Sequence, residues 1–152
     1  MTAISVSRDI RASSETVWNL LVDMDSWVEV IQAIEVVERL DAVPGFGVGT
    51  RWRETRTMFG KKAIEEMEVT ECIEGVSYST AAESHGSNYF SQLRVQPLAS
   101  GCRLTMEFRG EPQTAFTKIM DRTLGRFFIG ATKKALAKDL DDIAGAAEAA
   151  ES

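Results

Sequence analysis

The sequence predicts an α+β fold in which a curved antiparallel sheet of seven strands wraps around one long C-terminal helix, with two short helices after the first strand. Three observations lead to this prediction. Residues between 50 and 108 alternate between polar and apolar and are interrupted by X-Gly turns. Residues 115–143 carry apolar side chains at three- and four-residue spacing, and residues 13–31 contain two short helical patterns.

The N-terminal elements follow from local patterns. Residues 3–10 alternate and predict the first strand. Ser13 and Ser14 are good N-caps for a short helix, and Asp25 is a candidate cap for a second one. The apolar side chains expected on these two helices are Val17, Trp18, Leu21, Trp27, Val28 and Ile31. A strand over residues 34–40 and a glycine-rich loop over residues 41–49 follow.

Three hairpins are predicted in the middle of the chain, each with a glycine in its turn. A turn at Phe59-Gly60 pairs Trp52 with Met67 on one face and Arg53 with Glu66 on the other. A turn at His85-Gly86 pairs Tyr78 with Leu93 and Val76 with Val95. A turn at Ser100-Gly101 pairs Leu93 with Phe108, Val95 with Met106 and Arg94 with Glu107. All three registers give one apolar inner face, as a half-buried antiparallel sheet requires.

The C-terminal helix is predicted over residues 115–143, with Thr114 as its N-cap. We expect one domain over residues 1–145 and an Ala- and Glu-rich tail, 146–152, that frays. The charged residues of the last helical turns predict a solvated face, formed by Lys133, Lys134, Lys138, Asp139, Asp141 and Asp142.

Composition excludes several classes of function. The 152 residues include 17 Lys and Arg against 23 Asp and Glu, a net charge of −6 that argues against nucleic-acid binding. A single histidine and two cysteines 30 residues apart provide no metal-ligand pattern and no disulfide framework. No secretory signal, long apolar span, nucleotide loop or flavin motif is visible, so we expect a cytoplasmic protein without a cofactor or an integral membrane segment.

Three local phrases resemble one family. Ser14, Glu15, Val17, Trp18, Leu21 and Asp23 are similar to its S-x-E-x-V-W-x-x-L-x-D opening. Gly47, Gly49, Thr50, Arg51 and Trp52 are similar to its G-x-G-T-R-W phrase, and Val69, Thr70 and Glu71 to its V-T-E phrase. With the order of elements, these phrases resemble the helix-grip fold of the START-like (SRPBCC) superfamily, of the polyketide cyclase/dehydrase and lipid-transport type. The resemblance implies an internal pocket for lipids, sterols, quinones or polyketides, and catalysis of cyclisation or dehydration in a minority of members.

Candidate catalytic residues lie on the inner face of the first hairpin. The predicted register places Glu54 opposite Glu65, with Arg56 two residues along the strand. Two facing carboxylates on an apolar wall do not both ionise easily, so either Arg56 bridges them or one of the two has a raised pKa. Such a group suits acid/base chemistry on a polyketone, with Arg56 stabilising an enolate. A solvated ion cluster at an open mouth, or a site for a polar head group at Arg56, explains the same residues.

Candidate ligand-binding residues come from the inner sheet face and the helix. Thr80 faces Ser91 in the predicted register, between Tyr78 and Tyr89. Hydroxyl groups inside an apolar cavity orient ligands, although both tyrosines also suit ordinary core packing. The apolar candidates are Trp52, Met67, Phe108, Phe116, Met120, Leu124 and Phe127. Phe46 lies among glycines in the loop 41–49, which is either a lid over the pocket or a simple connection.

The leading hypothesis is therefore a monomer or homodimer that binds a small hydrophobic molecule between sheet and helix. The alternative is a cofactor-independent cyclase or dehydratase that uses Glu54, Glu65, Arg56 and Tyr89. A third hypothesis is an interaction module that pairs through a sheet edge or the long helix.

Overall fold

The computed structural model describes residues 2–58, 60–84, 87–112 and 115–152, and it describes their side chains except at residues 2, 58, 84, 87, 112 and 115–128. The seven strands are β1 (Thr2–Ile10), β2 (Ile34–Arg39), β3 (Arg51–Met58), β4 (Lys61–Ile73), β5 (Ser77–Ser84), β6 (Ser87–Leu98) and β7 (Gly101–Pro112). The helices are α1 (Ser14–Leu21), the 3₁₀ turn η1 (Met24–Ser26), α2 (Trp27–Val30) and α3 (Ala115–Glu151).

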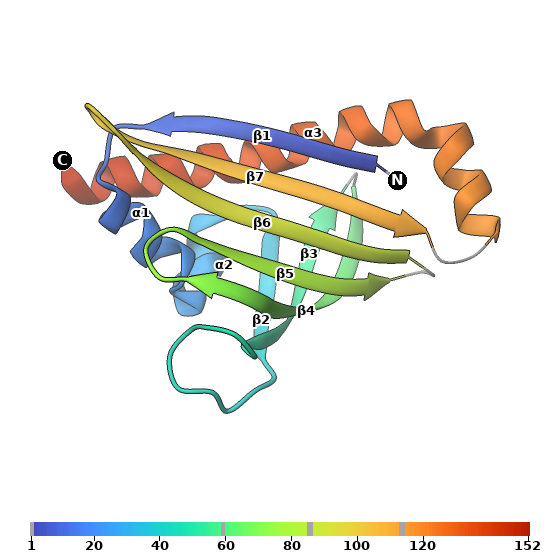
Figure 1. The fold of residues 1–152 in the computed structure, drawn as a ribbon, viewed down its shortest axis with the longest axis horizontal. Helices are drawn as coiled ribbons and strands as arrows, with labels where there is room; N and C mark the ends of the chain where they lie inside the picture. The colour runs from blue at the N-terminus through green and yellow to red at the C-terminus, as the bar shows by residue number, and fades with distance from the viewer. Residues whose placement is uncertain (1, 59, 85–86, 113–114) are drawn as a thin grey trace.

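The strands form one antiparallel sheet in the order β1-β7-β6-β5-β4-β3-β2. Helix α3 runs along one side of this sheet, and α1 and α2 lie near its C-terminal half (Figure 1). This arrangement confirms the predicted α+β fold class. No helix among the described residues is both long enough and apolar enough to span a membrane.

Two of the three predicted registers are confirmed. In β3–β4, Trp52 pairs with Met67 and Glu54 with Glu65. In β5–β6, Tyr78 pairs with Leu93. The turns at Phe59 and at His85-Gly86 lie outside the described residues.

The predicted register of β6–β7 is wrong by two residues. Leu93 pairs with Met106 and Val95 with Leu104, because the turn is centred on residues 99 and 100 and Gly101 already pairs with Leu98. Gly101 has a φ of 127°, and a Cβ there would lie 2.1 Å from the Ile10 carbonyl oxygen. The absence of a side chain at position 101 therefore permits the close approach of β1. It is not required by the turn, which lies at residues 99 and 100. A shift of two residues leaves every side chain on its predicted face.

The helix ends also differ from prediction. Ser13 caps α1, and its hydroxyl accepts a hydrogen bond from the Thr16 amide over 3.1 Å. Asp25 does not cap α2, because it lies inside η1 and Ser26 precedes the helix. Helix α3 continues to Glu151, so residues 146–151 do not form the predicted frayed tail.

The last turns of α3 are held by contacts that sequence patterns do not reveal. Ala144 and Ala147 are fully buried. The Glu148 carboxylate accepts a hydrogen bond from the Arg11 amide, and Glu151 accepts one from the Ser13 amide. These carboxylates attach the end of α3 to the segment that joins β1 to α1.

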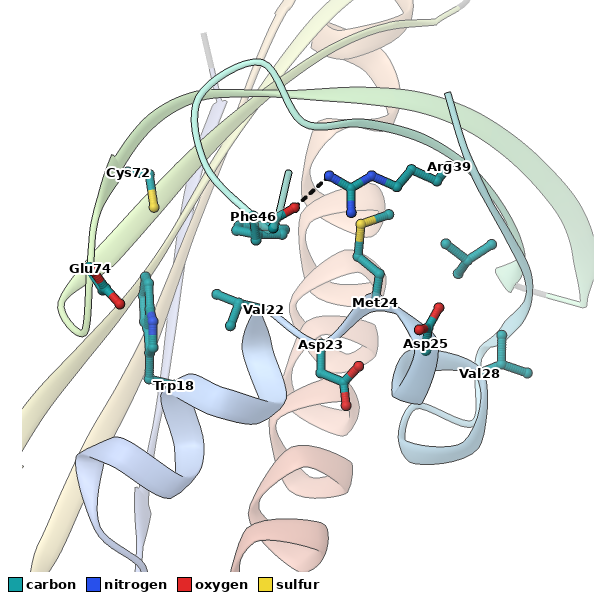
Figure 2. A pocket seen from close by; sticks show the side chains of 12 residues that line it. Trp18, Val22, Asp23, Met24, Asp25, Val28, Arg39, Phe46, Cys72 and Glu74 are labelled. Atoms are coloured by element: carbon teal, nitrogen blue, oxygen red, sulfur yellow. Dashed lines mark hydrogen bonds between the residues drawn. The ribbon is translucent and has the colours of Figure 1, made fainter. Parts of the chain in front are cut away.

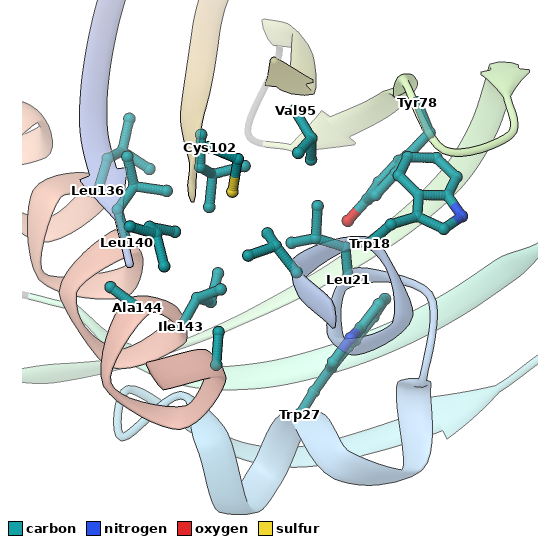
Figure 3. Close-up of a cluster of buried hydrophobic side chains, with 14 of the residues drawn as sticks. Trp18, Leu21, Trp27, Tyr78, Val95, Cys102, Leu136, Leu140, Ile143 and Ala144 are labelled. Carbon is teal, nitrogen blue, oxygen red and sulfur yellow. The ribbon is translucent and has the colours of Figure 1, made fainter. Parts of the chain in front are cut away.

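The buried core fills the space between the sheet, α1 and the C-terminal half of α3. Leu136 and Leu140 of α3 face Cys102 of β7, and Leu21 of α1 lies between α3 and the neighbouring rings of Trp18 and Tyr78 (Figure 3). Burial of large apolar side chains such as these contributes about 1.5–3 kcal/mol each. Beyond this core, toward β3 and β4, the inner face of the sheet carries polar groups among the apolar ones.

Candidate functional site

A pocket of about 220 Å³, here called the inner pocket, lies between the inner face of the sheet and α3. It is lined mainly by apolar and aromatic side chains from the strands, from α1 and α2, and from α3. Nine residues selected from the sequence line it: Trp52, Glu54, Arg56, Glu65, Met67, Tyr78, Tyr89, Ser91 and Phe108. The side chains of Phe116, Met120, Leu124 and Phe127 lie outside the described residues.

The alternation of β3 gives the pocket its charged wall. Side chains two residues apart on a strand point to the same face, so Trp52, Glu54 and Arg56 all face inward. The Trp52 indole Nε1 donates a hydrogen bond to Glu54 Oε1 over 2.9 Å, and Arg56 Nε donates one to Glu54 Oε2 over 2.9 Å. Glu54 is only 3% exposed, and these two donors provide a hydrogen bond to each of its carboxylate oxygens.

Arg56 also bonds to the helix opposite. Its Nη1 donates a hydrogen bond to Asp139 Oδ2 over 3.0 Å. The predicted solvated position of Asp139 is therefore wrong: the residue is 6% exposed and lines the pocket. Asp139 lies three residues after Leu136 and four before Ile143, so it shares the buried side of α3. That spacing is the signal in the sequence that could have identified it.

The three charged side chains Glu54, Arg56 and Asp139 form one buried group, here called the ionic cluster. Burial lowers the pKa of Arg56, but the two carboxylates outweigh this and hold it above its ordinary value. Burial raises the pKa of Asp139 above its ordinary value, and the attraction of Arg56 only partly opposes that effect. Arg56 thus joins Glu54 on the sheet to Asp139 on α3.

A second group of polar side chains lies on β5 and β6. The hydroxyl groups of Thr80 and Ser91 share a short hydrogen bond, as their facing positions predict. The ring of Tyr89 stacks on Phe108 with centroids 5.6 Å apart. Tyr78 is 5% exposed, and burial, with a contribution from the charge of Glu54, raises the pKa of its phenol. The phenol therefore stays protonated at neutral pH.

Aromatic side chains close one end of the pocket. Trp27 and Trp52 meet edge to face with centroids 5.0 Å apart. Phe46, from the loop between β2 and β3, contacts both of these rings and lies 4.9 Å from the ring of Tyr78. These three neighbours of Phe46 all line the inner pocket.

On the other side of Phe46 there is a second, larger hollow of about 570 Å³, here called the outer pocket. Its walls include Trp18, Asp25, Arg39 and Glu74 (Figure 2). Arg39 Nη2 donates a hydrogen bond to the Gly45 carbonyl oxygen, which fixes the loop beside Phe46. The outer pocket is more polar and is lined by none of the catalytic or ligand-binding candidates selected from the sequence, so the inner pocket is the better candidate site.

Comparison with known proteins agrees with this geometry. The family model described as polyketide cyclase / dehydrase and lipid transport matches residues 1–148. The comparison with curated protein sequences gives no match.

Solved structures share the fold across almost the whole chain. The protein TTHA0849 from Thermus thermophilus has a TM-score of 0.82 at 19% identity, with 99% of this chain and 100% of that one covered. The di-domain ARO/CYC StfQ of the steffimycin biosynthetic pathway has a TM-score of 0.82 at 11% identity, covering 98% of this chain and 52% of that one. A START superfamily protein from Mycobacterium smegmatis has a TM-score of 0.68 at 16% identity, covering 93% and 98%. At these identities the likeness shows the fold alone, and it confirms the predicted helix-grip architecture.

Proposed function

Because the chain belongs to the polyketide cyclase / dehydrase and lipid transport family, we propose that it binds one small hydrophobic molecule in the inner pocket. The molecule is a lipid, a quinone or a polyketide-like compound, taken up between the sheet and α3. The observation that carries this proposal is the lining of the inner pocket, where apolar walls surround one ionic cluster.

The physical argument rests on the two parts of that lining. Apolar ligand surface moved from water into the pocket contributes roughly 25 cal/mol per Å². The ionic cluster gives the ligand a preferred orientation, because buried polar groups bond to a ligand only in matching positions. A pocket formed this way selects molecules that are hydrophobic over most of their surface and polar at few points.

The test is native mass spectrometry after incubation with a lipid and metabolite extract, with a matched pair of variants. Ala82 lines the inner pocket, whereas its neighbour Ala81 lies outside it on the same strand. We expect wild type and Ala81→Trp to retain a small mass, and Ala82→Trp to lose it because the indole fills the pocket. Retention of the same mass by Ala82→Trp would show that binding occurs elsewhere, and no retention by any of the three would contradict the proposal.

The alternative function is a cofactor-independent cyclase or dehydratase. One observation favours it: carboxylates of the pocket lie beside a buried guanidinium, an arrangement that suits proton transfer and stabilisation of an enolate. In this alternative Glu54, Glu65 and Tyr89 exchange protons with a polyketone and Arg56 holds the enolate oxygen.

Turnover separates the two functions. Wild type is incubated with a poly-β-ketone bearing a thioester, and the products are followed by chromatography. An enzyme forms rings faster than buffer alone, and Glu54→Gln or Glu65→Gln reduces that rate by about 100-fold or more. If nothing turns over and both variants bind the ligand as wild type does, the enzyme alternative fails.

A further inference from the structure

Two residues of α3 that line the inner pocket each have one buried polar atom without a hydrogen-bond partner among the described residues. These atoms are Asp139 Oδ1 and Thr132 Oγ1. Their residues are 6% and 3% exposed, and both line the inner pocket. A buried polar atom without a hydrogen bond is destabilising, so a ligand group that bonds to either atom would remove part of that cost.

The hydrogen bonds that Asp139 already makes determine which ligand group can bond to its second carboxylate oxygen. Its Oδ2 already receives the Arg56 Nη1 hydrogen bond, and its Oδ1 remains available as an acceptor. An ionised carboxylate accepts hydrogen bonds and donates none. A ligand group that satisfies Oδ1 must therefore be a donor, such as a hydroxyl or an amine.

The charge of the ionic cluster argues against an anionic ligand. Arg56 is the cation among the described residues that line the pocket, and its charge is shared between Glu54 and Asp139. With both carboxylates ionised the cluster carries a net charge of −1. The side chains of Arg56 and Asp139 are 13% and 8% exposed, so water screens this charge weakly. A carboxylate or phosphate placed beside Asp139 would meet more negative charge than positive.

The spacing of the two atoms sets the length of the ligand. Thr132 and Asp139 are seven residues apart, which is about two helical turns and about 10 Å of rise. Their side chains face the same pocket but are too far apart for one small head group to reach both. The Thr132 hydroxyl both donates and accepts, so it serves a second polar group on the same molecule.

We propose that α3 recognises its ligand at two points, with Asp139 accepting a hydrogen bond from one hydroxyl or amine and Thr132 bonding a second polar group two turns away. The ligand is then an elongated, uncharged or cationic hydrophobic molecule that bears polar groups near both ends, such as a polyhydroxylated aromatic compound. This inference rests on the proposed function, because it names the chemical class bound in the inner pocket.

The test compares four two-ring probes by isothermal titration calorimetry: naphthalene, 2-naphthol, 2,6-dihydroxynaphthalene and 2-naphthoate. We expect 2-naphthol to bind about tenfold more tightly than naphthalene, since a hydrogen bond to a charged group contributes about that factor. The second hydroxyl should give a further gain of several-fold, and 2-naphthoate should bind most weakly. Tighter binding of 2-naphthoate than of 2-naphthol would overturn the proposal.

Two variants test separately whether Asp139 and Thr132 bond to the ligand. Asp139→Asn should reduce the advantage of 2-naphthol over naphthalene to a few-fold, because the charged acceptor is replaced by a neutral amide, and Thr132→Val should remove only the additional gain of 2,6-dihydroxynaphthalene. Asp141→Asn is the matched control, because Asp141 lies on the same helix, is exposed and pairs with Arg8 outside the pocket. An unchanged ratio of affinities in both Asp139→Asn and Thr132→Val would overturn the proposal.

The outcomes separate this inference from the proposed function. Binding of naphthalene and 2-naphthol with equal affinity contradicts recognition by α3 and leaves the hydrophobic pocket standing. If none of the four probes binds while wild type still retains a small mass from the extract, the inference fails and the proposed function stands; if no mass is retained either, the proposed function fails and the inference fails with it. If Asp139→Asn does not fold, Thr132→Val still decides the second point of contact, because valine conserves the volume and removes only the hydroxyl.

Discussion

The carboxylate of Asp139 lies in an apolar wall with the Arg56 guanidinium as its counter-ion. Burial raises the pKa of this carboxyl above 3.8, and the attraction of Arg56 only partly opposes the rise. A carboxyl group with a higher pKa in the folded state than in the unfolded state lowers stability once it ionises. Ionisation of Asp139 therefore lowers stability, a cost that is common for groups that serve ligand binding.

The first prediction follows from the destabilising effect of ionised Asp139. Asp139→Asn should be more stable than wild type at pH 7, because the amide keeps an oxygen for Arg56 and carries no charge. The difference should shrink as the pH falls through the raised folded-state pKa toward 3.8, and below 3.8 Asp139 is protonated in both the folded and the unfolded state. Melting temperatures of both proteins at pH 3 and pH 7 test this, and a lower melting temperature for Asp139→Asn at pH 7 would contradict it.

The sequence predicts the positions of some site residues and not of others. Inward positions on β3 follow from strict alternation, so Glu54 and Arg56 could be placed on the correct face in advance. Asp139 is predicted on the wrong face, because charged neighbours surround it and its spacing from Leu136 and Ile143 is the one signal that indicates the buried side of the helix. Which cation a buried carboxylate bonds to depends on how α3 lies against β3, and no local pattern contains that information.

Among the elements, the loop between β2 and β3 is ordered by one side chain. Asp41 accepts hydrogen bonds from the amides of Val43 and Arg51 and from the guanidinium of Arg39. These bonds, chiefly the one from the Arg51 amide, lower the pKa of Asp41 from 3.8 to about 2. The loop therefore has a defined conformation, and it places Phe46 against the aromatic end of the inner pocket.

The second prediction concerns the pH dependence of that loop. A lowered carboxyl pKa stabilises the folded state above pH 3.8, and the contribution is lost as the pH falls from 3.8 toward 2. Asp41→Asn should thus melt at a lower temperature than wild type at pH 7, and the difference should nearly vanish at pH 2. A constant difference in melting temperature from pH 7 to pH 2 would show that the charge of Asp41 plays no part.

The third prediction concerns Phe46, which separates the two pockets. Phe46→Ala removes contacts with three rings and should lower the free energy of unfolding by about 2 kcal/mol, less than for a fully buried phenylalanine. It should also open a path from the outer to the inner pocket and raise the rates of ligand association and dissociation. Stopped-flow fluorescence measures these rates.

Val48→Ala provides the control for Phe46→Ala. Val48 lies in the same loop but is 61% exposed, so its truncation should change neither stability nor rates. Equal rates in Phe46→Ala and wild type would assign Phe46 to packing alone, and the loop would then be a simple connection.

The hairpins show what strand patterns determine. Alternation assigns each side chain to a face, and turn position assigns the register. The prediction for β6–β7 is wrong only in the position of the turn. Gly101 is a glycine because β1 approaches it closely, and it does not belong to the turn. The sheet face was predicted correctly even so, since the error was an even number of residues.

At the scale of the whole molecule, the fold could be predicted because local propensity, hairpin pairing and the long apolar helix all agree on one architecture. The helix-grip arrangement then places α3 across the inner face of the sheet (Figure 1). The position and size of the inner pocket could not be predicted in this way. They depend on how completely side chains from six or more elements fill that space, which is a property of packing in three dimensions.

The proposed function requires that a small hydrophobic molecule occupies the inner pocket. The most direct measurement is the change in backbone amide chemical shifts when 2-naphthol is added to ¹⁵N-labelled protein. We expect the largest changes at Trp52, Glu54, Thr80, Ser91 and Asp139. Changes confined to the outer pocket, at Trp18, Asp25 and Glu74, or no changes at saturating 2-naphthol, would contradict it.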